Sequence, residues 1–291
     1  AVVAALAYVA VRQQAAARSR WRRVHLAGFA LAAVSVALFP GGLMSAKLLP
    51  HRLGAEFGGP ETALVAVRDG TAQTAMLLRR TRFGEALDYR LLTDAYSMSA
   101  TSVGAQRYMK LFAYLPLALH PEPRTALLIS YGVGMTAEAL TQSPDLTSID
   151  VVDTSREIVG LSDSIFVGSA AHPLRDVRVT VHIEDGRYFL ANTPRQYDLI
   201  TGEPPPPKAA GVVSLYTREY FSLIRDRLAR GGLVTYWLPV HELTEDDARS
   251  ILQAFCQVFD DCSLWNGDHM DWIMLGDREA SGQPDPVRLA A

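Results

Sequence analysis

The sequence predicts an α/β domain in which a mostly parallel sheet carries helices on both faces, with a small antiparallel sheet and an apolar helical segment before it. Three observations predict this organisation. After residue 123, short apolar runs alternate with helical segments, as they do in parallel sheets. Three β-prone runs lie close together within residues 62–93. Residues 24–46 are apolar, without a charge apart from a titratable histidine.

The most informative stretch is a strand, a glycine turn and a helix, followed by a second strand. The apolar run of residues 125–129 leads to Gly132 and Gly134, which let the backbone turn sharply and leave room for a ligand. The second strand ends at Asp153, about twenty residues later, where a nucleotide-binding unit holds a pair of ribose hydroxyls. We therefore expect Gly132, Gly134 and Asp153 to bind a nucleoside. The alternative is a tight turn in an ordinary α/β domain.

This glycine turn differs from a dinucleotide-binding turn. Ser130 stands where the first glycine of the dinucleotide fingerprint would be, and no pyrophosphate cradle is evident. S-adenosylmethionine, or a relative of it, therefore fits the turn better than NAD.

Acidic residues also follow the next two predicted strands. Asp185 and Gly186 come after the strand of residues 178–183, and Glu203 follows the strand of residues 197–201. Ligands of such sheets bind beyond the carboxyl ends of the strands. We expect Asp185 and Gly186 to accept the adenine amino group, and Glu203 to act as a general base or as the anchor of a cationic amine. Taken singly, each acid has the alternative of a solvated loop residue or a helix cap.

Composition narrows the class of protein. The 291 residues are 49% hydrophobic and 20% charged, which suffices for one large domain or two small ones. A net charge of −3 gives no indication of a nucleic-acid partner. Cys256 and Cys262 have no metal-binding or redox spacing, so we expect no metal, and a buried small residue and a strand residue are the favoured interpretations. They would pair as a disulfide if the domain worked outside.

The first part of the chain predicts attachment to a membrane. Residues 1–11 look like the end of a membrane helix, residues 12–23 form a basic loop, and residues 24–46 are long enough to span a hydrocarbon core of ~30 Å. Because the chain opens at Ala1 within an apolar run, we interpret it as a piece of a longer protein. A buried core helix is the alternative for residues 24–46. The arginine distribution places the following domain outside, whereas the supply of an adenosylmethionine donor favours the cytoplasm, and the sequence leaves this open.

These segments give four regions. They are a membrane-helix remnant (residues 1–49), a small β-sheet domain (50–95), the α/β domain (96–278) and a polar tail (279–291). Residues 94–102 are interpreted as a polar loop. Residues 106–119 are interpreted as an amphipathic helix that ends before the glycine-turn strand.

Several motifs, in the same order, resemble a known family over residues 62–275. They are His120-Pro121-Glu122-Pro123-Arg124, Asp185-Gly186-Arg187-Tyr188-Phe189, the run from Tyr197 to Pro204 and the run from Ala210 to Phe221. They are similar to the polyamine aminopropyltransferases (spermidine and spermine synthases), and most to their bacterial membrane-fused branch, the fused MFS/spermidine synthases. The resemblance implies a Rossmann-like class I S-adenosylmethionine-dependent transferase fold and a homodimer.

The chain departs from this family at several expected polar positions. Val133 stands where the family has an aspartate for the donor's aminopropyl amine, and Met98 where it has a donor-binding glutamine. The family has two aspartates after the strand that corresponds to residues 197–201. In this chain Glu203 replaces the first and Pro206 the second. The resemblance therefore implies that the nucleoside ligands are kept and that the amine ligands have changed.

We expect a transferase domain that binds S-adenosylmethionine or its decarboxylated form and passes an aminopropyl group to a small amine or another nucleophile. Glu203 would take the proton of the attacking group. Tyr108 and Tyr216 would line the substrate pocket, with core packing as the alternative for both. Two other functions stay open at this point. One is a methyltransferase on the same fold, and the other is a non-catalytic nucleoside-binding module of a membrane transporter-like protein.

Overall fold

The computed structural model describes residues 18–38, 51, 53, 57, 61–71, 73–94, 96–209 and 211–279. The chain divides into two compact units, Ala1–Arg52 and Leu53–Ala291. All strands described below belong to the second unit.

The first unit contains the helix α2 (Arg18–Ala37). This helix begins inside the arginine-rich segment, so its first turns carry charged residues. Among the residues that the structure describes, no helix is long and apolar enough to cross a membrane. The prediction of a membrane-spanning helix over residues 24–46 is therefore wrong, and so are the membrane localisation and the membrane partner that depended on it. The predicted helix over residues 1–11 lies outside the described residues, as do residues 39–46.

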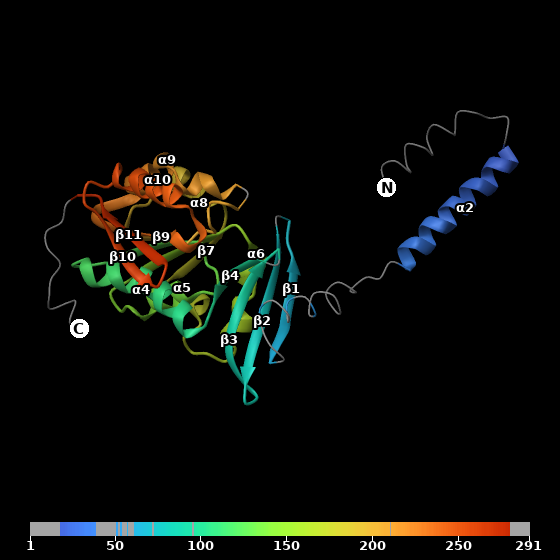
Figure 1. The fold of residues 1–291 in the computed structure, drawn as a ribbon, viewed down its shortest axis with the longest axis horizontal. Helices are drawn as coiled ribbons and strands as arrows, with labels where there is room; N and C mark the ends of the chain where they lie inside the picture. Colours follow the sequence, from blue (N-terminus) through green and yellow to red (C-terminus); the bar gives the residue numbers. More distant parts are fainter. Residues whose placement is uncertain are drawn as a thin grey trace. The chain divides into compact units, whose positions relative to one another are not determined.

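A four-stranded antiparallel sheet opens the second unit. Its strands are β1 (Thr62–Asp69), β2 (Thr74–Arg82), β3 (Glu85–Thr93) and β4 (Tyr96–Ala100), paired in that order (Figure 1). The predicted small antiparallel sheet is thus confirmed. The strand β4 lies in the stretch that was predicted to be a polar loop, and its backbone pairs with β3. It matters for function because it forms part of the wall of the cavity described below.

The main sheet has seven strands in the order β10-β11-β9-β8-β5-β6-β7. They are β5 (Thr125–Ile129), β6 (Ser148–Asp153), β7 (Val179–Ile183), β8 (Tyr197–Gly202), β9 (Leu228–Pro239), β10 (Cys262–Asp268) and β11 (Asp271–Asp277). The strands β7, β6, β5, β8 and β9 run parallel, and β11 and β10 close one edge in antiparallel orientation. The strand order reverses between β5 and β8, and such a reversal leaves a crevice beyond the carboxyl ends of these strands.

Helices cover both faces of this sheet (Figure 1). One face carries α4 (Val103–Leu119), α5 (Met135–Gln142), α6 (Arg156–Gly160) and α7 (Ser162–Ile165); the other carries α8 (Gly186–Asn192), α9 (Arg218–Arg227) and α10 (Glu245–Cys256). Three short 3₁₀ turns, η2 (Pro173–Arg175), η3 (Val212–Tyr216) and η4 (Val240–Glu242), join these elements. In β5, Ala126 and Leu128 pack in the first core, and Leu127 and Ile129 in the second. A strand covered on both faces must be apolar at every position, which explains the unbroken apolar run.

Cys256 and Cys262 form a disulfide that joins the end of α10 to the first residue of β10. The favoured interpretation of two unpaired residues is therefore wrong. The two positions lie in different elements, and the short turn between them brings the thiols together.

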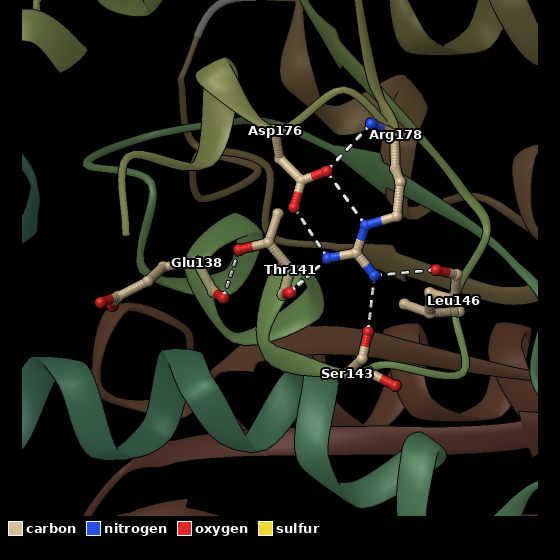
Figure 2. Close-up of polar contacts among 6 residues, drawn as sticks. All are labelled: Glu138, Thr141, Ser143, Leu146, Asp176 and Arg178. Carbon is tan, nitrogen blue, oxygen red and sulfur yellow. Dashed lines mark hydrogen bonds and ion pairs between the residues drawn. The ribbon is translucent and has the colours of Figure 1, made fainter. Parts of the chain in front are cut away.

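Arg178, just before β7, fixes the end of α5 (Figure 2). Its guanidinium donates to the carbonyl oxygens of Thr141, Ser143 (2.7 Å) and Leu146 (2.8 Å), and it pairs with Asp176 at 2.7 Å. The last carbonyls of a helix have no partner within the helix, so an arginine in this position supplies the missing donors. Since α5 begins at the glycine turn, this contact also steadies one side of the predicted nucleoside site.

Candidate active site

A cavity of about 690 Å³ lies where the strands β5, β6, β7 and β8 end. The predicted residues that line it are Gly132, Asp153, Asp185, Gly186, Glu203 and Tyr108. The four strand ends thus bring together Gly132 and Glu203, about seventy positions apart in the sequence, as expected at the switch point of a parallel sheet.

Asp153 connects the end of β6 to the glycine turn after β5. One carboxylate oxygen accepts the backbone N–H of Tyr131 and the other accepts that of Ser155, both at 2.8 Å. Burial raises the pKa of Asp153, and these two N–H groups oppose that rise. The carboxylate is therefore held in one orientation, and each oxygen retains a lone pair that could accept a further hydrogen bond.

The turn that Asp153 holds is built from left-handed backbone conformations. Gly132 and Gly134 have φ of 56° and 83°, and Ser130 has φ of 75°. A serine rarely adopts this conformation, so the departure from the dinucleotide fingerprint at Ser130 has a cost of about 1 kcal/mol or more in backbone strain. A Cβ atom at Gly132 would lie 3.0 Å from Oγ of Ser99 in β4, so a side chain here would press on the small sheet as well as strain the left-handed backbone.

Asp185 both caps a helix and lines the cavity. Its Oδ1 accepts the backbone N–H of Tyr188 at 2.8 Å and so caps α8, which is the alternative that the sequence left open. It also lines the cavity. Next to it, a Cβ atom on Gly186 would lie 2.7 Å from a methyl group of Ile129, so this position must be glycine for α8 to pack on β5.

Glu203 follows β8, and its backbone N–H donates to the carbonyl of Ile129 in β5 at 3.1 Å. Its carboxyl group forms a short hydrogen bond with the hydroxyl of Thr136 on α5. Burial raises the pKa of Glu203 from 4.5 to about 8; the Thr136 hydroxyl opposes this rise and the charge of Asp271 adds to it. A carboxyl group in this environment can both give and take a proton near neutral pH.

The Thr136 hydroxyl has two acceptors within reach but only one hydrogen. Its Oγ1 lies 3.0 Å from the carbonyl oxygen of Met109 as well as next to Glu203. When Glu203 is ionised, the hydroxyl donates to its carboxylate. When Glu203 is protonated, the acid donates to Thr136, whose hydrogen then turns to Met109. The hydroxyl can therefore form a hydrogen bond with either form of Glu203, and on balance it favours the ionised one.

Two predicted site residues lie elsewhere. Gly134 is the N-cap of α5 and Tyr216 is buried, and neither is among the described residues that line the cavity. The hydroxyl of Tyr216 donates to the carbonyl of Pro204 at 3.2 Å, and its ring packs edge-on against Tyr236. Tyr216 thus supports the loop after Glu203 from behind, which is the core-packing alternative.

The three positions at which the chain departs from the family lie in different surroundings. Val133 is fully buried in the core beneath the turn, whereas Met98 and Pro206 line the cavity. The cavity wall is therefore apolar at two positions where the resemblance implies polar groups.

Sequence reasoning missed several residues that line the cavity. They include Ser99 from β4, Thr136 from α5, Lys208 from the loop after β8 and Trp237 from β9. Tyr96 from β4 lines it as well. Tyr108 stacks on Trp237 with a centroid distance of 6.5 Å. Residues 96–102 are mostly serine, threonine and other small residues, which favoured a loop and gave no signal of a cavity wall. Across the described residues, no group of three His, Cys, Asp or Glu side chains is placed to hold a metal ion.

Comparison with known proteins decides the family. The model of the spermine/spermidine synthase domain matches residues 105–265, more than half of the chain. The chain belongs to the spermine/spermidine synthase family. The motifs at the strand ends of this synthase-family domain all lie within or next to the matched range. The membrane-fused branch of the family is not established by the match.

Relatives and solved structures agree with this assignment. The synthase-family domain is 30% identical over 154 residues to a polyamine aminopropyltransferase of Streptococcus pneumoniae serotype 4, covering 52% of this chain and 53% of that protein. It is 29% identical over 175 residues to putrescine N-methyltransferase 2 of Nicotiana tabacum, covering 58% of this chain and 48% of that protein. The chain thus spans about half the length of these curated relatives.

The fold is shared with a solved spermidine synthase in complex with the transition-state analogue AdoDATO. The two superpose with a TM-score of 0.66 at 15% identity, covering 77% of this chain and 75% of that one. The predicted Rossmann-like fold class is therefore confirmed, apart from its membrane helix.

Proposed function

We propose that this domain transfers an aminopropyl group from decarboxylated S-adenosylmethionine to a small amine. The observation that carries the proposal is the position of Glu203, a carboxyl group of raised pKa in the same cavity as Asp153 and the glycine turn. A base placed beside a nucleoside site suits a reaction in which a nucleophile loses a proton while it attacks the nucleoside's side chain. Membership of the spermine/spermidine synthase family supports the same reaction.

The proposed roles follow the strand ends. Asp153, whose two oxygens are already fixed by backbone N–H groups, would accept the ribose hydroxyls. Asp185 would accept the adenine amino group through the oxygen that does not cap α8. Gly132 would let the nucleoside approach the first turn of α5, and Tyr108 would form the wall on the acceptor side. Gly134, which does not line the cavity, would act only by shaping the turn.

In the transfer step, the lone pair of the acceptor nitrogen attacks the carbon next to the sulfonium. A carbon–nitrogen bond forms, the carbon–sulfur bond breaks, and its electron pair stays on sulfur, so that neutral methylthioadenosine leaves. The proton lost by the acceptor nitrogen passes to the ionised carboxylate of Glu203. The Thr136 hydroxyl, hydrogen-bonded to that carboxylate, keeps it aimed during the transfer.

A calorimetric titration of the chain with decarboxylated S-adenosylmethionine tests the nucleoside site. Asp153→Ala should weaken binding about ten- to a hundredfold, because hydrogen bonds to a charged group are lost. Asp198→Ala is the matched control: its carboxylate also accepts two backbone N–H groups at 2.9 Å, from Arg124 and Thr125, but at the opposite ends of the strands. Equal affinities of wild type and Asp153→Ala would sink the assignment.

Methyl transfer from S-adenosylmethionine is a second candidate, and one observation favours it. Because Val133 is buried in the core, the glycine turn offers no carboxylate at that position to the ammonium of an aminopropyl group. Relatives named putrescine N-methyltransferase also match the chain. Mass spectrometry of the product separates the two reactions: aminopropyl transfer releases methylthioadenosine, and methyl transfer releases adenosylhomocysteine.

The regional boundaries and the oligomeric state also remain proposals. We keep residues 96–278 as the proposed transferase region and residues 50–95 as the proposed small-sheet region, although the pairing of β4 with β3 continues that sheet to Ala100. A homodimer is implied by the resemblance alone. Light scattering of the purified chain would test it.

A further inference from the structure

The glycine turn after β5 has one side that faces the cavity and one side that is buried. Tyr131 and Gly132 line the cavity. Residues 162–166, which comprise α7 and Phe166, pack against the buried side, and we refer to them as the support segment. Neither Ser162 nor Phe166 is among the described residues that line the cavity, and the transfer step above does not use them.

The phenol of Tyr131 reaches into the buried side of the turn. Its oxygen lies 2.6 Å from Oγ of Ser162, the first residue of α7, and both residues are buried. A Cβ atom on Gly134 would collide with the phenol, so the ring lies directly beneath this glycine. The hydrogen bond between Tyr131 and Ser162 therefore connects the turn to the support segment.

The phenol of Tyr131 stays neutral in these surroundings. Burial raises its pKa, and the hydrogen bond to Ser162 opposes only part of that rise. A protonated phenol and a serine hydroxyl can each donate to the other, so the contact holds with either hydrogen placed between the two oxygens. When one hydroxyl is removed, the other stays buried without this partner, which has a cost in free energy.

Phe166 is the second contact between the support segment and the turn. A Cβ atom on Gly134 would lie 3.1 Å from Cε2 of Phe166, so the ring packs closely against the backbone there. On its other side, Phe166 packs against the imidazole of His172 with a centroid distance of 5.4 Å. Nε2 of His172 lies 3.1 Å from Oδ1 of Asp163, the residue after Ser162. The support segment is thus fixed from behind by the chain that follows it.

The turn needs such support because its backbone is strained. Ser130, with φ of 75°, directly precedes Tyr131, and Gly132, with φ of 56°, directly follows it. A serine in this conformation persists only where the surrounding structure fixes it from several directions. Tyr131 supplies two of these fixed points, because its N–H donates to Asp153 and its phenol contacts Ser162.

We propose that Tyr131 and Ser162 are positioning residues for the nucleoside, and that their hydrogen bond holds the glycine turn in the conformation that admits this ligand. The two hydroxyls act through the backbone of the turn. Because the N–H of Tyr131 also orients the carboxylate of Asp153, a shift of residue 131 would disturb the group proposed to accept the ribose hydroxyls. This inference rests on the proposed function for the identity of the ligand.

Calorimetric titration of the full chain with methylthioadenosine tests the inference. Tyr131→Phe keeps the ring beneath Gly134 and removes only the hydroxyl. Tyr131→Phe and Ser162→Ala should each weaken binding about three- to tenfold, the range that corresponds to one neutral hydrogen bond. The double variant should bind about as weakly as either single variant, because both substitutions remove the same contact.

Tyr197→Phe is the matched control. Tyr197 is also a buried tyrosine, and its hydroxyl donates to Asp150 at 2.7 Å, but it is not among the described residues that line the cavity. This variant should lose stability and keep the affinity of the wild type for methylthioadenosine. Unchanged affinity in Tyr131→Phe and Ser162→Ala would overturn the inference, and so would an equal loss of affinity in Tyr197→Phe. Should Tyr131→Phe fail to fold, Ser162→Ala decides alone.

Hydrogen exchange of the free chain reports on the turn without any nucleoside. The amides of Tyr131 and Gly134 donate to Asp153 at 2.8 Å and to the carbonyl of Tyr131 at 2.9 Å. They should exchange faster in Ser162→Ala than in the wild type or in Tyr197→Phe, because the turn opens locally. If the wild type does not bind methylthioadenosine, the proposed function fails and exchange decides the inference. Faster exchange then supports the role of the support segment, and unchanged exchange contradicts it.

Discussion

At the residue scale, the proposed transfer depends on the hydrogen bond between the Thr136 hydroxyl and the Glu203 carboxyl group. Glu203 is buried enough to favour its neutral form, and Thr136 is the neighbour whose hydrogen bond favours its ionised form. As a base in the proposed transfer, Glu203 must be ionised. The activity of the free enzyme should therefore rise with pH and level off above about pH 8.

Thr136→Val should move this rise to higher pH. Valine has nearly the shape of threonine but cannot donate, so the pKa of Glu203 should increase further when the hydrogen bond is removed. The dependence of kcat/KM on pH, measured for the wild type and the variant, checks this. Thr136→Ser keeps the hydroxyl and should restore the original profile. A lower kcat/KM with an unchanged inflection would mean that Thr136 only supports α5.

The three acids at the strand ends were predictable, because a buried strand and the residue after it can be read from a local pattern. Asp153, Asp185 and Glu203 all line the cavity as expected. The second function of Asp185, as the cap of α8, has a local signal too. Ser99 and Trp237 were not predictable as cavity residues, because their approach depends on how the small sheet packs against the main one.

At the element scale, the end of α5 depends on a distant arginine. Arg178 donates to the carbonyl of Thr141 in the last turn of α5 and to those of Ser143 and Leu146 after it, and it pairs with Asp176 (Figure 2). Among the described residues, only Arg178 donates to these carbonyls. Its side chain therefore replaces the glycine cap that many helices have. The helix that starts at the glycine turn is thereby fixed at both ends.

Arg178→Ala should lower the free energy of unfolding by about 2–3 kcal/mol, because partly buried carbonyls lose charged donors. Arg175→Ala is the matched control: Arg175 and its partner Asp163 are 68% and 69% exposed, and an ion pair of this kind contributes about 0.5 kcal/mol or less. Urea denaturation of both variants gives the two values. Similar losses in both would show that the contacts of Arg178 do not stabilise the fold.

Elements with a strong pattern were easier to predict than those set by tertiary pairing. The apolar runs of β5 and β6 are continuous because both faces are covered, and this signal is local. The strand β4 has polar residues at several positions and is a strand because β3 offers it backbone partners. The strand β9 includes Gly231 and Gly232, at the place where its register with β8 shifts between Leu228 and Leu233, and its pairing with β11 begins only at Leu233.

At the scale of the whole molecule, a buried acid in the cavity makes stability depend on pH. The pKa of Glu203 is about 8 in the folded chain and near 4.5 in an unfolded one. Between these two values the folded state binds more protons than the unfolded state, so stability falls as the pH rises through this window. The contribution is fully present below about pH 4.5 and is lost above about pH 8.

Glu203→Gln should therefore be more stable than the wild type at pH 9 and nearly equal to it at pH 5. Glutamine resembles the protonated acid at every pH, and one unit of pKa difference corresponds to about 1.4 kcal/mol, so the gain at pH 9 should reach a few kcal/mol. Thermal melting of both proteins across this range measures it. Parallel curves from pH 5 to pH 9 would contradict the raised pKa.

The α/β architecture was predictable because it rests on a pattern repeated along most of the chain. The membrane helix was not correctly predicted, since an apolar run of adequate length does not determine where a helix begins: α2 starts among the arginines. The disulfide between Cys256 and Cys262 was not predicted either. Whether two cysteines pair depends on the redox compartment as well as on their positions, and the sequence left the compartment open.

The position of Ser99 against Gly132 has a consequence for protein engineering. Because residues 62–100 contain the small sheet, one side of the cavity comes from a contiguous stretch that precedes the glycine turn altogether. Transplanting this stretch between members of the family would exchange one wall of the cavity while the glycine turn and the strand ends stayed intact. The junction to preserve in such a chimera is the serine–glycine contact, where a larger side chain on either partner would push the two halves apart.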